Sequence, residues 1–331
     1  MLGLVAICLL ASTSNIHAET LDSTVIGMFP KDVSDFGYAD LSQARQLSWY
    51  PQFEAQLVPV ALFEFEQFLQ AIQMRQSSPI NQVAWATVGS EQINSDTGKA
   101  GHSTSRNEQP VAVAVGDFDI ETIKAYVDSK NIPSIQSQDH ILYASGTGSG
   151  PSNIFFTLLD SHAIAFGSLQ PLERVLKIRD GEEDSLLQNQ EMMTLIERAN
   201  GEGIFWGVLD SGGAARAIDR LIPEAAKFPQ SRDLMKKLAD VLITVKAPGD
   251  IELELKAASA SPGDAGLTSQ LFQIGVLLQR YQTNSDTNPE MAKLLDALRI
   301  TSNGARIAIS LELTTEQIIS LIEHNTFIFK M

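Results

Sequence analysis

The residues of this chain best suited to catalysis are Asp210 and Ser211, which follow an apolar run ending at Leu209. An apolar strand that leads into Asp-Ser-Gly can present a catalytic carboxylate for peptide hydrolysis, but that chemistry needs a second carboxylate close enough to share a proton. The other Asp-Ser/Thr-Gly sequence, at 96–98, has no apolar strand before it. Asp210 is therefore a weak catalytic candidate, and the simpler interpretation is that Asp210 or Ser211 caps a helix beginning near Ala214.

Metal ligands are scarce in the sequence. The histidines beyond residue 18 are His102, His140, His162 and His324, and no two of them stand at metal-ligand spacing. The single cysteine, Cys8, lies in the amino-terminal apolar run, so the remaining chain has no thiol for a disulfide, a nucleophile or a metal. We expect no metal and no cofactor, and a non-enzymatic protein is favoured over an enzyme.

A ligand site is the other kind of chemistry that the residue types allow. Aromatic residues gather between positions 49 and 68, and the candidates for lining a ligand groove are Trp49, Tyr50, Phe53 and Phe63. Apolar pockets bind most small ligands. Aromatic clusters more often pack a helix against the core, however, because these side chains dominate core burial.

Residues 1–18 have the pattern of an export signal. An apolar run of about ten residues from Leu2 to Ala11 is too short to span a bilayer of roughly 30 Å, and Ile16-His17-Ala18 supplies a cleavage site. We therefore expect a periplasmic or extracellular protein. Attachment as a lipoprotein through Cys8 is less favoured, because the residues before Cys8 lack the small side chain that such a signal needs next to the cysteine.

Charge limits the choice of partner. The 331 residues carry a formal net charge of -16, and no cluster of Lys or Arg offsets it. Such a surface repels phosphate backbones, so nucleic acid is excluded as a partner. Beyond residue 18 no apolar stretch reaches eighteen residues, so we expect no transmembrane segment after cleavage, and a ligand or an envelope protein as partner.

Strict alternation of apolar and polar residues predicts strands at 251–257 and 306–313, each with one apolar and one wet face. Pro248-Gly249-Asp250 joins the first of these to an apolar run at 241–247, which predicts an antiparallel hairpin. Further strands are expected at 82–89, 111–118, 141–145, 154–159, 163–166 and 204–209.

Helices are expected after Asp119, Ser261 and Thr314, each of which is a good N-cap. In the helix after Ser261, a stripe at helical spacing is expected to pack on the sheet, formed by Leu267, Leu271, Ile274, Leu278 and Tyr281. Residues 118–123 and 313–318 align as strand-to-helix steps, which suggests an internal repeat.

These elements predict an α+β fold of two tandem units, each a mainly antiparallel sheet with helices packed on one face. Residues 19–180 form the first unit and 181–331 the second, after the signal peptide at 1–18. The polar stretch at 91–109 is too long for an ordinary connection and is expected to be a disordered loop.

Three sequences, Met28-Phe29-Pro30-Lys31-Asp32, Tyr38-x-Asp40-Leu41 and the run at 162–167, are similar to those of exported bacterial proteins of unknown function. That resemblance implies a mixed α+β fold and an envelope location, and it brings no catalytic residues with it.

The leading hypothesis is an exported, non-enzymatic protein that binds a ligand or an envelope component. One alternative is a hydrolase that uses Asp210. Another is a structural or assembly role through the wet sheet face around Glu252, Glu254 and Glu312.

Overall fold

The computed structural model describes residues 19–48, 50, 79–90, 107–145, 154–214, 237–247, 249–283 and 289–323. The predicted signal peptide, most of the predicted loop at 91–109 and three of the aromatic candidates, Trp49, Phe53 and Phe63, lie outside these ranges.

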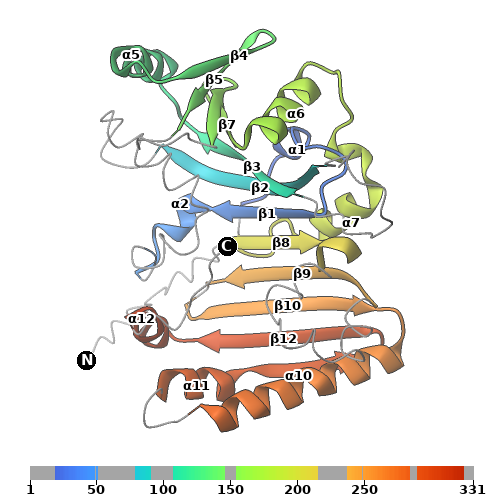
Figure 1. The fold of residues 1–331 in the computed structure, drawn as a ribbon. Helices are drawn as coiled ribbons and strands as arrows, with labels where there is room; N and C mark the ends of the chain where they lie inside the picture. Colours follow the sequence, from blue (N-terminus) through green and yellow to red (C-terminus); the bar gives the residue numbers. More distant parts are fainter. Residues whose placement is uncertain are drawn as a thin grey trace, which may run out of the picture.

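Twelve described strands form one antiparallel sheet in the order β11-β12-β10-β9-β8-β1-β2-β3-β7-β6-β5-β4 (Figure 1). This confirms the predicted α+β class with antiparallel pairing. In chain order the strands are β1 (Asp35–Asp40), β2 (Ile80–Ser90), β3 (Asn107–Gly116), β4 (Ser134–Ser137), β5 (His140–Ala144), β6 (Phe155–Leu158), β7 (Ala163–Gly167), β8 (Phe205–Leu209), β9 (Leu238–Lys246), β10 (Ile251–Ser259), β11 (Arg299–Asn303) and β12 (Arg306–Leu313).

The two predicted units contribute the two halves of this one sheet. Strands β1 to β7 come from residues 19–180 and lie together, and β8 to β12 come from residues 181–331. Pairing of β1 with β8 joins the halves, with Phe36 opposite Val208. The internal repeat stays a prediction.

Helices lie against both faces of the sheet. One face is covered by α1 (Ser23–Ile26), α6 (Leu169–Arg179), the 3-10 helix η1 (Leu186–Gln188) and α7 (Gln190–Ala199). The other face is covered by α2 (Leu41–Ala44), α5 (Ile120–Lys130), α10 (Pro262–Gln282), α11 (Pro289–Ala297) and α12 (Thr315–Glu323).

The second helical layer, which the predicted single layer does not include, follows from strands that are apolar on both sides. Val83 and Ala84 are neighbours in β2 that point to opposite faces, and both are fully buried. Val113 and Ala114 of β3 repeat this arrangement. A strand of this kind needs cover on both faces.

The second half of the sheet has the wet face that the alternation predicts. Ile251, Leu311 and Leu313 point to the side that α11 and α12 cover. Glu252 and Glu312 face each other on the opposite side, where Glu312 is exposed.

Predicted helix starts are confirmed by the hydrogen bonds that the caps make. The Asp119 carboxylate accepts from the Thr122 amide at 3.1 Å, and the Ser261 hydroxyl accepts from the Asp264 amide at 3.1 Å. At α12 the Thr314 hydroxyl accepts from the Gln317 amide at 3.3 Å, and the Thr314 amide donates to the Gln317 side chain at 2.8 Å. The last pair is a capping box.

Candidate functional site

Asp210 acts as a helix cap in the structure. Its carboxylate accepts a hydrogen bond from the Gly213 amide at 2.6 Å, and its carbonyl accepts from the Ala214 amide at 2.8 Å. The Asp210 amide donates to the Ser34 carbonyl at 3.0 Å, and this bond connects the turn to the start of β1. Asp96, the nearest sequence analogue for a second carboxylate, lies outside the described ranges. The contacts of Asp210 are thus those of a helix cap, which is the simpler of the two interpretations of this residue.

Tyr50 is the one aromatic ligand candidate that the structure describes. It is 1% exposed and belongs to the core cluster that α2 and β2 share. Its environment is that of a core side chain. Packing against the core was the alternative to a ligand groove for these aromatic residues.

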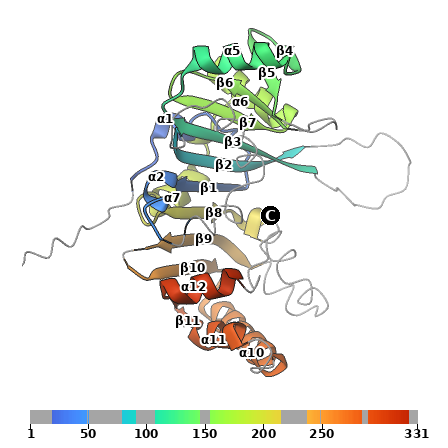
Figure 2. The same ribbon diagram turned by 90° about the vertical axis from the view of Figure 1, so that its left-hand side faces the viewer.

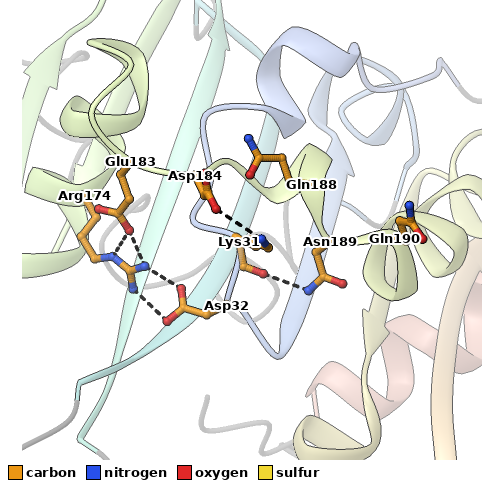
Figure 3. Close-up of a pocket in the computed structure, with 8 residues that line it drawn as sticks. All are labelled: Lys31, Asp32, Arg174, Glu183, Asp184, Gln188, Asn189 and Gln190. Carbon is orange, nitrogen blue, oxygen red and sulfur yellow. Dashed lines mark hydrogen bonds and ion pairs between the residues drawn. The ribbon is translucent and has the colours of Figure 1, made fainter.

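A shallow basin of about 630 Å³ lies where residues 30–32 meet the chain between α6 and α7. Arg174 of α6 reaches two carboxylates there, bonding Asp32 at 2.6 Å and Glu183 through Nε at 2.6 Å (Figure 3). Lys31 donates to Asp184 at 3.2 Å. Each charged side chain that lines the basin is therefore already paired.

The ion pairs of the basin join two segments that are distant in the sequence, residues 31–32 and residues 174–184. Burial is the largest single influence on the pKa of Arg174 and lowers it, but the hydrogen bonds to Asp32 and Glu183 and their charges together raise it. Backbone bonds run alongside, from the Leu186 amide to the Phe29 carbonyl at 2.7 Å. The Phe-Pro-Lys-Asp sequence singled out above thus serves to hold the acidic loop at 180–184.

Buried polar groups meet at the end of β1. Asp40 is fully buried, and its Oδ1 caps α2 by accepting from the Gln43 amide at 2.9 Å and from Ser42 at 2.7 Å. The Tyr38 hydroxyl donates to the Glu19 carbonyl at 3.1 Å. Burial, with the charges of Asp40 and Glu19, raises the pKa of Tyr38 strongly, so this phenol stays neutral. These contacts fix the first residues after the predicted cleavage site to the sheet.

Helix α10 corrects the expectation about its packing. The stripe Leu267, Leu271, Ile274, Leu278 and Tyr281 was expected to lie on the sheet, but all of it except the half-buried Leu271 is exposed and faces away from the sheet. The prediction was wrong because the residues that do pack there are small or polar, and a count of large apolar residues passes over them. They are Ala265, Thr268 and Ser269, all buried, with the half-buried Phe272.

Small inner residues let α10 lie close to the sheet. Ala265 is fully buried in a cluster with Ala257 of β10 and Ile307 of β12. Gln273 donates to the carbonyl of Ile300 in β11 at 3.0 Å, which ties the helix to the last strand of the sheet. Figure 2 shows α10 and α11 together at that end of the molecule.

The outer face of α10 is the largest group of exposed apolar side chains on any described helix. We define it as Leu267, Leu271, Ile274, Leu277, Leu278 and Tyr281. Exposed fractions are 53% for Leu267, 52% for Ile274, 67% for Leu277, 57% for Leu278 and 90% for Tyr281. Surface apolar residues are common singly, but a contiguous group marks an interaction site.

Other kinds of site are not found in the part of the chain that the structure describes. Across these ranges no three His, Cys, Asp or Glu residues gather as metal ligands. The described helices also include none with both the length and the hydropathy needed to cross a membrane.

The sequence matches no family model and no curated protein. Among solved structures, crystal form III of TP0453 is similar over 92% of this chain and 99% of that chain, with a TM-score of 0.51 and 10% identity. Crystal form I of TP0453 covers 93% and 98% with a TM-score of 0.48, and form IV covers 91% and 96% with 0.47, both at 10% identity. At this identity the likeness to form III shows a shared fold.

Proposed function

We propose that this is an exported, non-enzymatic protein that binds a protein partner in the cell envelope through the outer face of α10. Export rests on the signal pattern of residues 1–18, and the location follows as periplasmic or extracellular. The observation that carries the binding role is the outward position of the stripe from Leu267 to Tyr281.

Exposure of an apolar face to water costs free energy, and a partner that covers the face removes this cost. Full burial of one leucine or isoleucine side chain contributes about 1.5–3 kcal/mol, so covering several half-exposed ones contributes several kcal/mol in total. Leu277 and Tyr281 are the most exposed of the group. Tyrosine is among the residues that most often anchor a protein interface.

The outer face is also uncharged, in a chain whose net charge is -16. No Asp, Glu, Lys or Arg occurs at 265–279. The charges at the two ends are paired inside the chain, since Asp264 accepts from Lys237 at 2.7 Å and Arg280 bonds Asp296 at 2.8 Å. An apolar helix face without charge suits an apolar protein surface.

The wet sheet face suits this role less well. Glu254 pairs with Lys256 at 2.8 Å, and Glu252 lies between Lys246 and Glu312 across the strands. Mixed charge in near balance is what a solvated sheet face carries. The basin at Arg174 is closed to a charged ligand by its own ion pairs.

Site-specific photocrosslinking in the producing cell tests the proposal. A photoreactive phenylalanine analogue at Ile274 should give a discrete crosslinked product that is lost when Leu277 and Leu278 are both changed to glutamine. The same analogue at Gln279, which is exposed on the other side of the helix, is the matched control and should give none. Equal products at both positions, or none at either, would contradict the proposed function.

Export is tested by mass spectrometry on the same material. The protein from the exported fraction should lack residues 1–18. A full-length mass, with the protein confined to the cytoplasm, would exclude an envelope role.

A further inference from the structure

We propose that the outer face of α10 binds the same face of a second copy of this chain, with the two helices antiparallel about a two-fold axis beside Ile274. This inference rests on the proposed function and names the partner.

The spacing of the stripe is that of a helix pair. Leu267, Leu271, Ile274, Leu278 and Tyr281 follow one another at intervals of four, three, four and three residues. This is the repeat of the seam between two helices of a coiled coil, in which each apolar residue of the seam fits between residues of the other helix. The period of the five-residue stripe therefore suits a helix as the occupant.

The outer face is also symmetric about Ile274 except at Leu278, because Leu271 and Leu277 stand three residues before and after Ile274. Leu267 and Tyr281 stand seven residues before and after Ile274. In an antiparallel pair, Leu267 lies against the partner's Tyr281, and Ile274 lies against the partner's Ile274. A two-fold interface needs such a self-complementary surface, because each contact must occur twice.

The area is sufficient for a specific dimer. From their exposed fractions, the side chains of the outer face offer on the order of 600 Å² on each copy. Complete burial of both faces covers on the order of 1,200 Å² in total, which is the lower end of stable specific interfaces. Leu277 supplies contact beside the seam, since it is among the most exposed of the group.

Charge selects this face and this direction. Two copies that each carry -16 repel each other over most of their surfaces, and the uncharged stretch at 265–279 is a place where they can touch. Antiparallel packing opposes the two helix dipoles, whereas the charges of Asp264 and Arg280 are already paired within each chain. Parallel packing would place like ends together.

Gly275 supports close approach at the axis. A Cβ added there would meet nothing within 4 Å, so the chain itself has no steric need for glycine at this position. Glycine in a helix interior weakens the helix relative to alanine. Beside Ile274 it allows the two helix backbones to come together.

Cysteine crosslinking tests the arrangement on the whole chain with Cys8 changed to serine, so that each introduced thiol is the single one. With a short bismaleimide, Ile274→Cys should crosslink to itself, and a mixture of Leu267→Cys with Tyr281→Cys should form the mixed dimer. Gln279→Cys should stay uncrosslinked. A Leu267→Cys variant that crosslinks to itself more readily than Ile274→Cys would overturn the antiparallel axis.

Sedimentation equilibrium measures the strength of the pair. Ile274→Asp places two like charges at the axis and should raise the dimer dissociation constant at least about a hundred-fold. Gln279→Asp should leave it within about three-fold. Because both positions are exposed, both variants should melt with the unchanged chain at dilute concentration, so a loss of dimer is not a loss of folding. A chain that stays monomeric at every concentration, with no crosslinking at Ile274, would overturn the inference.

Two other occupants give distinct results. Flotation with phosphatidylcholine vesicles, with and without phosphatidylglycerol, that depends on Ile274 in a monomeric chain would assign the face to lipid and overturn both proposals. A crosslinked product in cells that differs in mass from a dimer, from a chain that is monomeric when purified, would overturn the second copy and leave the proposed function standing.

Discussion

Thr268 allows a quantitative test of which side of α10 faces the sheet. It is fully buried, and its hydroxyl has no hydrogen-bond partner among the described residues. A buried polar group without a partner costs about 1–3 kcal/mol, and valine has almost the same shape without the hydroxyl. Thr268→Val should therefore raise the free energy of unfolding by about 1–2 kcal/mol.

Charged substitutions also test which side of α10 faces the sheet, because a charge is costly only on the buried side. Thr268→Asp buries a charge and should cost at least about 3 kcal/mol. Leu278→Asp alters a side chain that is 57% exposed and should stay within about 0.5 kcal/mol of the unchanged chain.

Thermal unfolding followed by circular dichroism measures these differences, at a protein concentration low enough that association does not contribute. In a chain of 331 residues each kcal/mol moves the midpoint by about 1–2 °C. If Leu278→Asp lost several kcal/mol while Thr268→Asp did not, the helix would lie with its large apolar stripe inward. That result would refute the reasoning behind the outer face and both proposals drawn from it.

Three further predictions concern the sheet and the helix caps. Asp210→Ala should lose about 1 kcal/mol of stability through the lost cap while Asp210→Asn keeps it, measured by urea unfolding; hydrolysis of a peptide or ester that the Asn variant abolishes would instead support the hydrolase alternative. Hydrogen bonds from Thr122 lower the pKa of Asp119 below 3.8, so its stabilisation is present above that value and is lost as the pH falls through the folded-state pKa; melting curves from pH 7 to about pH 2 should show a shallower acid loss for Asp119→Asn. Gly37→Ala would put a Cβ 2.3 Å from the ring of Trp85 and should cost about 1–3 kcal/mol, whereas Gly266→Ala, which meets nothing within 4 Å, should gain up to about 1 kcal/mol in the same unfolding assay.

Alternation predicted the strands that have one wet face, because burial there follows residue type directly. The registers of β10 with β9 and with β12 agree with the expected hairpin and with the apolar side of each strand. Caps at Asp119, Ser261 and Thr314 were equally readable, because capping depends on a few neighbouring residues.

Strands whose pattern is weak were missed. β4 is short and polar and lies at the edge of the sheet, with Ser134, Ile135 and Gln136 all exposed. β1 lies in the middle of the sheet, but its sequence Asp-Phe-Gly-Tyr-Ala-Asp carries glycine, alanine and two acids. The alternation of Phe36 and Tyr38 was its signal. Residues 107–109 were assigned to the polar loop and instead begin β3, because Asn107 pairs with Ser90 in the register of the hairpin.

The candidate site was missed in the sequence because it depends on which side of a helix is covered. Large apolar residues in α10 indicate a face that needs cover, and a sheet in the same chain is the first place to seek it. The structure shows that Ala265, Thr268 and Ser269 occupy that place. The heptad spacing of the stripe, which suits a helical partner, was present in the sequence and was the signal that could have found the site.

The pairing of β1 with β8 sets the order in which this chain can fold. Residues 35 and 209 are partners, so the middle of the sheet cannot close until β8 has been synthesised and, for an exported chain, has crossed the membrane. Until then the free edge of β1 presents unpaired amides and carbonyls to any other extended chain. The first half is therefore exposed to aggregation during the interval in which residues 41–204 follow it, and a chaperone that shields this edge would act at that stage. Formation of the β1–β8 pair is thus the step that joins the two halves into one sheet.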